Sequence, residues 1–188
     1  MLAQIGVVPD QVIPAEIDET PRRGELPRRY AERLAREKAL RVAVPGCLTL
    51  AADTVVAVGR RILGKAGSAE QARACLTLLS GRRHHVLTAI TLIAADGSAS
   101  HRLSDTGVIF TRLTEHDIEN YIETNEWEGK AGGYAIQGRA AAFVKSIHGS
   151  YSGVVGLPLY ETSQLLKGSK ARGSAPRTPP GPEAPDPR

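Results

Sequence analysis

The chain has 188 residues, with 24 Lys and Arg against 20 Asp and Glu, and 41% of its residues are hydrophobic. These values fit one globular domain and exclude a collagen-like chain, a coiled coil and a disulfide scaffold. No apolar run reaches the roughly 20 residues that cross a bilayer, and the start of the chain does not resemble a signal peptide. Cys47 and Cys75 lack metal-ligand spacing. We therefore expect a cytoplasmic protein without a membrane partner.

The composition changes at Gly168. Six of the 12 prolines lie in residues 168–188, together with four basic and two acidic residues, so this segment carries half of the formal net charge of +4. We expect one domain over residues 1–167 and a disordered, Pro-rich tail over residues 168–188. Because the tail holds much of the charge and aromatic residues are few, we expect no nucleic-acid partner. Nucleic-acid binding through the basic tail is the alternative.

The first half of the chain alternates between helical and extended patterns. Residues 28–43 favour a helix, because Pro27 precedes them and apolar residues recur at helical spacing. Residues 47–58 are rich in Val, Leu and Thr, which is typical of a strand. Ser68 is suited to cap a helix that ends near Gly81.

The second half continues with two strands, over residues 86–95 and 103–113, on either side of an Asp-Gly turn signal. Thr114 is expected to cap a helix to about residue 124, a further strand covers residues 140–147, and a last helix runs from Pro158 to Gly168. Strands and helices mixed in this way predict an α/β fold, or the alternative α+β class, with a mixed sheet and flanking helices.

Asp53 is the first candidate for chemistry, because it interrupts the apolar β-type run of residues 50–56. A buried, unpaired carboxylate costs several kcal/mol, so Asp53 needs a cation or a hydrogen-bond network. Two interpretations stay open. Asp53 either belongs to a capped turn or a structural ion pair, or it is a general base or metal ligand that faces a cleft.

Several further residues fit a phosphate site, although each also has a simpler explanation. Lys65 follows a glycine, and Lys38 lies on the first predicted helix. For each lysine two interpretations stay open: its ammonium group binds a phosphate, or it points into solvent and binds nothing. Glu19 either binds a divalent ion or lies in a turn. The segment 129–138 has four glycines around Lys130, so its backbone N–H groups suit an anion. Its Gln137 offers both a donor and an acceptor, as the edge of a base requires.

Seven short strings occur in a recognisable order: residues 17–20 (IDET), 34–39 (LAREKA), 52–54 (ADT), 62–65 (ILGK), 79–81 (LSG), 130–138 (KAGGYAIQG) and 149–158 (GSYSGVVGLP). Together they resemble the Maf family of nucleoside triphosphate pyrophosphatases, over residue 2 to about residue 166. The resemblance implies a mixed α/β fold with two lobes around a cleft, related to inosine-triphosphate pyrophosphatase. It also implies cleavage of a nucleoside triphosphate to the monophosphate and pyrophosphate with a divalent cation (Mg²⁺, Mn²⁺ or Co²⁺), and a homodimer.

The resemblance also assigns roles to individual residues. Asp53 matches the proton acceptor that activates water, and Glu19 and Asp53 match the residues that support the metal. Lys38, Lys65 and Lys130 would hold the triphosphate. Thr54 and Gln137 resemble the branch of the family that acts on dTTP and UTP, whereas the branch that acts on 7-methyl-GTP tends to have Gln and an acid at these positions.

The chain departs from the family pattern at its start. The family has a strand and a Ser-x-Ser-Pro-Arg-Arg loop that holds phosphates, and residues 1–6 here match the family segment on the C-terminal side of that loop. Either the start codon is wrongly assigned or the chain is shortened, and we expect little activity in the second case. Residues 20–26 (TPRRGEL) mimic the loop but lie where the family has a variable stretch. A catalytically impaired, regulatory nucleotide-binding protein, of the type linked to inhibition of septum formation, is the alternative function.

Overall fold

Five strands form one sheet in the computed structural model, which describes residues 1–173. Their order across the sheet is β2 (Arg61–Leu63), β1 (Thr49–Val58), β3 (Arg83–Ile93), β4 (Ala99–Phe110) and β5 (Val144–His148). Every pair of neighbours among them is antiparallel. The predicted α/β architecture is confirmed, but this sheet is antiparallel where a mixed one was predicted. Short turns at Gly59 and Gly97 reverse the chain between β1 and β2 and between β3 and β4.

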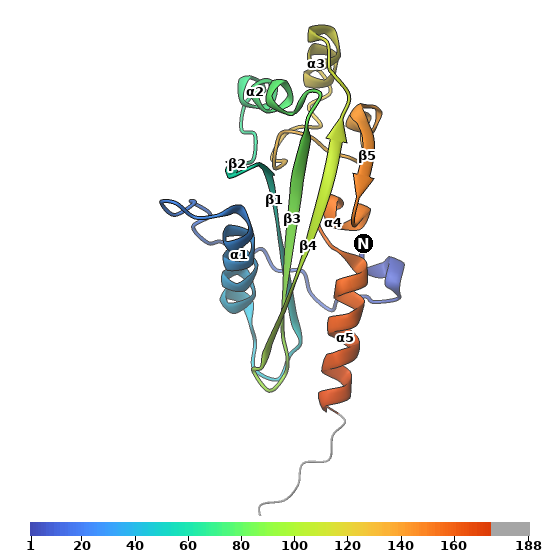
Figure 1. The fold of residues 1–188 in the computed structure, drawn as a ribbon. Helices are drawn as coiled ribbons and strands as arrows, with labels where there is room; N and C mark the ends of the chain where they lie inside the picture. Colours follow the sequence, from blue (N-terminus) through green and yellow to red (C-terminus); the bar gives the residue numbers. More distant parts are fainter. Residues whose placement is uncertain (174–188) are drawn as a thin grey trace, which may run out of the picture.

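The helices cover both faces and one end of this sheet (Figure 1). They are α1 (Pro27–Val42), α2 (Ala69–Leu79), α3 (Glu115–Ile122), α4 (Tyr151–Val155) and α5 (Leu159–Gly173), with short 3₁₀ helices at Leu2–Ile5 and Arg139–Phe143. Helix α1 lies on one face, α4 and α5 lie on the other, and α2 and α3 cover one end. Within residues 1–173, none of these helices combines the length and the apolar character that a membrane span requires.

Several predicted bounds differ from the structure. The strand expected over residues 140–147 begins at Val144, because the Ala-rich stretch before it forms a 3₁₀ turn. The last helix passes through Gly168 and continues to Gly173, since the residues after Gly168 include good helix formers. The short elements β2 and α4 were not predicted. Residues 174–188, most of the predicted tail, lie outside the described residues.

The alternation of side chains along β1 and β3 divides the core between the two faces of the sheet. Val55 and Leu87 pack with α1, whereas Ile90 packs with α5 on the opposite face. The same alternation sends the adjacent side chains of Asp53 and Thr54 to opposite faces. Asp53 contacts α1, and Thr54 contacts β3 below α4.

The edge of β1 is open over part of its length. Strand β2 pairs only with Val56–Val58, so the residues of β1 before Val56 have no strand partner on this side in the described part of the chain. An open edge allows a ligand to contact side chains from both faces of the sheet. The candidate residues of the sequence gather around this edge.

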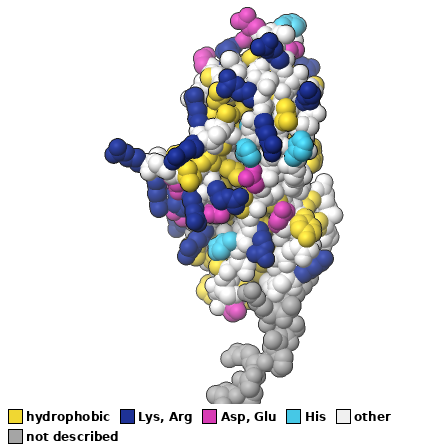
Figure 2. All heavy atoms as spheres, viewed as in Figure 1, with side chains coloured by type: hydrophobic (Ala, Val, Ile, Leu, Met, Phe, Trp, Pro, Cys, Tyr) yellow, Lys and Arg dark blue, Asp and Glu magenta, His cyan; other side chains and the backbone are white. Residues whose placement is uncertain are grey.

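Charged side chains crowd the side of the molecule that carries α1 (Figure 2). Much of this positive charge is paired, because Arg33 binds Glu25 at 2.7 Å and Glu37 at 3.1 Å. Arg22 also binds Glu37, at 3.2 Å. The surface of α1 is therefore an alternating charge network rather than an unbroken basic patch.

Candidate active site

Two adjoining pockets, of about 240 and 260 Å³, lie at the open edge of β1. They share four lining residues, which are Asp53, Thr54, Lys65 and Ala131. Six of the predicted residues line the first pocket: Lys38, Asp53, Thr54, Lys65, Lys130 and Gln137. Glu19 lines the second. The fold thus brings all seven candidates to one place, although they are spread over residues 19–137.

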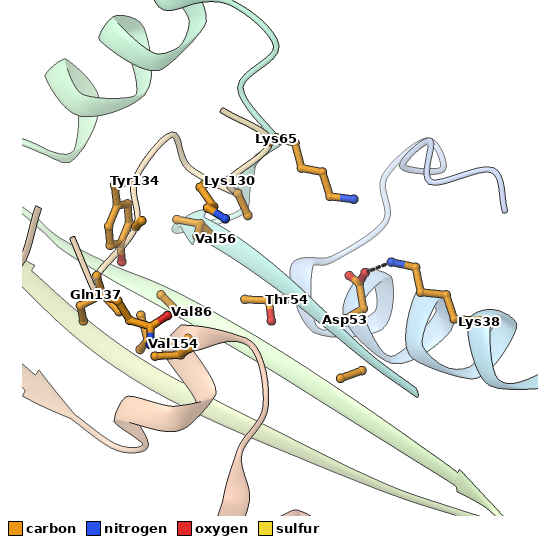
Figure 3. A pocket seen from close by; sticks show the side chains of 16 residues that line it. Lys38, Asp53, Thr54, Val56, Lys65, Val86, Lys130, Tyr134, Gln137 and Val154 are labelled. Atoms are coloured by element: carbon orange, nitrogen blue, oxygen red, sulfur yellow. Dashed lines mark hydrogen bonds and ion pairs between the residues drawn. The ribbon is translucent and has the colours of Figure 1, made fainter. Parts of the chain in front are cut away.

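Opposite charges alternate along one side of this site. The Nζ atom of Lys38 lies 2.5 Å from Oδ1 of Asp53 and 2.8 Å from Oε1 of Glu19. The other carboxylate oxygen of Glu19 lies 2.6 Å from Nζ of Lys65. Figure 3 shows Lys38 on α1 directed at Asp53 on β1, with Lys65 above them. Two carboxylates and two ammonium groups therefore compensate one another.

The Asp53 side chain is nearly inaccessible, with 6% of its surface exposed. Burial raises the pKa of Asp53 above its usual value, while the hydrogen bond from Lys38 acts in the opposite direction. Burial also acts to lower the pKa of Lys38, but its hydrogen bonds to Asp53 and Glu19 outweigh burial and raise it. Asp53 is thus a charged carboxylate in a weakly solvated place, where its affinity for a proton is increased.

Backbone pairing places Lys65 and Lys130 close together. Lys65 and Ala131 form an isolated antiparallel bridge, and the N–H of Ala66 donates to the carbonyl of Lys130. Gly132 makes this approach feasible. Its φ is +69°, and a Cβ there would lie 2.8 Å from a methyl group of Val56. Lys130 is exposed and has no ion pair within the described residues, so its charge is available to an anion.

The other end of the first pocket is largely apolar. Val86, Tyr134 and Val154 line it beside Gln137, as Figure 3 shows. The position of Tyr134 is fixed by a buried hydrogen bond of 2.8 Å between its hydroxyl and Nε2 of His84. Burial lowers the pKa of His84 to about 4, so this histidine is neutral at pH 7. Gln137 is exposed and makes no hydrogen bond within residues 1–173, so its amide faces the pocket unpaired.

The two carboxylates suit a divalent cation. Asp53 and Glu19 both contact the single ammonium of Lys38, so their oxygens converge on one position that a positive charge occupies. Carboxylate oxygens are the donors that Mg²⁺ and Mn²⁺ prefer. The described residues contain no group of three or more His, Cys, Asp or Glu that could hold a metal. A cation here would therefore draw its other ligands from water and from phosphate oxygens.

The structure also places residues in the two pockets that were not predicted as site residues. Tyr30 lines the second pocket, and Val86 and Val154 line the first, although their sequence pattern indicates only core positions. Residues 20–26, which mimic the phosphate-binding loop of the family, contribute only in part to these pockets. Pro21 lines the second pocket, whereas Arg22 pairs with Glu37 on α1 and lines neither pocket.

Comparisons with known proteins identify the family. The model of the family described as Maf-like protein matches residues 1–169. A protein of Gluconobacter oxydans (strain 621H) named dTTP/UTP pyrophosphatase is 58% identical over 175 residues, which cover 89% of this chain and 80% of that protein. Proteins with the same name from Caulobacter vibrioides (58% over 170 residues, 89% and 88%) and Rhodospirillum rubrum (57% over 174 residues, 92% and 83%) are similar too. The chain therefore belongs to the family of Maf-like proteins.

Proposed function

We propose that this chain is a nucleoside triphosphate pyrophosphatase, which hydrolyses dTTP and UTP to the monophosphate and pyrophosphate. The observation that carries the proposal is the buried Asp53 carboxylate at the meeting point of two pockets that also hold Lys38, Lys65 and Lys130. Relatives that are 57–58% identical and named dTTP/UTP pyrophosphatase support the same reaction.

The three lysines would bind the triphosphate. A nucleoside triphosphate carries about four negative charges at neutral pH, and cleavage adds charge to the leaving pyrophosphate. Lys65 and Lys130 lie on two segments that pair through their backbones, so both ammonium groups can reach one phosphate chain. Lys65 would exchange Glu19 for phosphate oxygens, which replaces one anionic partner by another.

Asp53 would act as the general base. A carboxylate whose pKa is raised by burial accepts a proton from water more readily than an exposed one. Lys38, at 2.5 Å, keeps Asp53 ionised in the free protein and fixes its orientation. The activated water would then attack the α-phosphorus, the bond from that phosphorus to the α,β-bridging oxygen would break, and pyrophosphate would leave. The proton taken up by Oδ of Asp53 would pass to solvent before the next cycle.

The proposal includes a divalent cation, either Mg²⁺, Mn²⁺ or Co²⁺. Glu19 and Asp53 would hold it, since their carboxylates already converge on one positive charge. Such an ion supplies a Lewis acid that neutralises charge on the phosphoryl oxygens. Lys38 would leave its place between the two carboxylates and turn to the phosphates.

Thr54 and Gln137 would read the base. The amide of Gln137 offers a donor and an acceptor, which match the O4 acceptor and the N3–H donor of uracil and thymine. Val86 and Val154 would pack against the faces of the ring. Thr54 bonds Thr88 at 3.0 Å, so its hydroxyl is fixed at the boundary between the base and the phosphates. A site that hydrogen-bonds a polar edge rejects bases that lack the matching pattern.

A comparison of substrates tests the proposal. Pyrophosphate release is measured with dTTP, UTP, CTP and 7-methyl-GTP, at equal concentrations and with saturating Mg²⁺ or Mn²⁺. We expect dTTP and UTP to be the fastest and Gln137→Glu to reduce their lead over 7-methyl-GTP. A folded, active protein that hydrolyses 7-methyl-GTP far faster than UTP would contradict the proposal.

Three further expectations accompany the proposed activity. The nucleotide pool that it would act on and the reduced Cys47 and Cys75 favour the cytoplasm. The homodimer implied by the family stays a prediction, which native mass spectrometry would test. The expected absence of a nucleic-acid partner also stays a prediction.

A further inference from the structure

Glu19 belongs to a segment without regular secondary structure. Between the 3₁₀ helix Leu2–Ile5 and the start of α1 at Pro27, the chain forms neither helix nor strand. A carboxylate on such a segment is positioned only as well as its side-chain contacts allow. The precision of a cation site that includes Glu19 therefore depends on the residues that hold this segment.

Helix α1 holds the segment through two neighbouring carbonyl groups. The hydroxyl of Tyr30 donates to the backbone carbonyl of Glu19 at 2.5 Å. The guanidinium of Arg33, three residues further along α1, donates to the carbonyl of Thr20 at 3.1 Å. Residues three apart lie side by side on a helix, so one patch of α1 fixes two successive peptide groups.

Tyr30 is itself rigidly placed. Only 9% of its surface is exposed, and its ring packs with Leu34 and Val55 in the core between α1 and the sheet. The guanidinium of Arg33 covers the ring, with its central carbon 5.4 Å from the ring centre. Burial and the nearby carboxylates of Asp53 and Glu19 raise the pKa of Tyr30, so its hydroxyl remains a donor at neutral pH.

When the triphosphate binds, the carboxylate and the backbone carbonyl of Glu19 are affected differently. Its carboxylate is held by Lys38 and Lys65, which the proposed function turns toward the triphosphate. Its carbonyl accepts a hydrogen bond from Tyr30, which carries no positive charge that the phosphates would attract. Within the described residues, Tyr30 is thus the partner of Glu19 that stays in place when both lysines leave.

We infer that Tyr30 is a positioning residue, which holds Glu19 so that its carboxylate can bind the divalent cation once the lysines have turned to the phosphates. The inference rests on the proposed function, because it requires a cation at Glu19. Tyr30, Leu34 and Lys38 lie at i, i+4 and i+8 of α1, so one face of the helix sets both the backbone and the carboxylate of Glu19.

The test uses Tyr30→Phe, which removes the hydroxyl and keeps the ring. The Mg²⁺ concentration that gives half-maximal UTP hydrolysis should rise roughly tenfold, with kcat at saturating Mg²⁺ within about threefold of the parent. Mn²⁺ binding in the presence of α,β-methylene-UTP, followed by electron paramagnetic resonance, should weaken to the same extent. Tyr160→Phe is the matched control, because Tyr160 is 72% exposed on α5, and it should change neither value.

A double-mutant cycle with Glu19→Gln separates positioning from general stability. Tyr30→Phe should add nothing to the loss of Mn²⁺ affinity in Glu19→Gln. Unchanged metal requirement in Tyr30→Phe, or losses that add independently, would overturn the inference. A folded parent that does not hydrolyse UTP would count against the proposed function alone, because the Mn²⁺ measurement still tests Tyr30; a parent that binds no Mn²⁺ with the analogue would overturn the inference as well.

Discussion

Replacing Asp53 by Asn isolates the proton acceptor with little change in shape. The amide keeps the size of the side chain and a hydrogen-bonding oxygen, but it cannot take a proton from water at neutral pH. Because burial raises the pKa of Asp53, its charged form is destabilised in the folded protein, and Asn removes that cost. The loss of the ion pair acts in the opposite direction, but Lys38 keeps Glu19 at 2.8 Å. We expect the melting temperature to change by only a few degrees, about 1 kcal/mol or less.

The effect on catalysis should be much larger. A positioned general base contributes about 10²- to 10⁴-fold, which corresponds to about 3 to 5 kcal/mol of the barrier. We therefore expect kcat for UTP to fall by this factor in Asp53→Asn. The affinity for the triphosphate should change less, because Lys65 and Lys130 do not contact Asp53.

The assay is pyrophosphate release from UTP at saturating metal, between pH 4.5 and pH 9. In the parent, kcat/KM should fall on the acid side as Asp53 is protonated. Asp53→Asn should lose this acid limb along with most of the rate. A variant that is folded and retains kcat within about threefold of the parent would remove Asp53 from the role of base.

Other contacts in the structure lead to three further predictions. Lys130→Gln should raise KM for UTP roughly tenfold, as expected for the loss of one charge-assisted contact. The melting temperature should not change, because Lys130 is exposed and has no ion pair within the described residues. An unchanged KM would contradict the role of Lys130 in binding the triphosphate. Gly132→Ala should destabilise by about 1–3 kcal/mol and lower activity, since its φ is +69° and Val56 lies 2.8 Å from the new Cβ; equal urea midpoints would refute this. Because the pKa of His84 falls from 6.5 to about 4 on folding, the free energy of unfolding should decrease as pH falls from about 6.5 to about 4, and His84→Gln should lose that dependence in urea titrations.

The local patterns of the sequence predict most of the elements. Residues 28–43, with their helical spacing, form α1, and Thr114 caps α3 with a full capping box. Short or weakly patterned elements were not predictable in this way. Strand β2 has only three residues, so its sequence pattern is too short to recognise. Because it pairs with only the end of β1, the rest of that edge of β1 stays open, which only the structure reveals.

The candidate site shows the same division between local and long-range information. Asp53, Lys65 and Lys130 are visible in the sequence, because a charge interrupts an apolar run or lies beside glycine. Their proximity, and the sharing of Lys38 between Asp53 and Glu19, come from contacts across 15 or more residues that no periodicity encodes. Tyr30 has the pattern of a core residue, and only the direction of its hydroxyl distinguishes it.

The central claim is that the protein cleaves UTP between the α- and β-phosphates, and the products of the reaction test this directly. Purified protein is incubated with UTP and Mg²⁺, and ³¹P NMR together with anion-exchange chromatography tracks the products over time. Cleavage by the proposed route predicts UMP and pyrophosphate in equal amounts, with no UDP at any time and with formation about 10²- to 10⁴-fold slower in Asp53→Asn. UDP and phosphate as the first products, or no cleavage of UTP by folded protein, would contradict it.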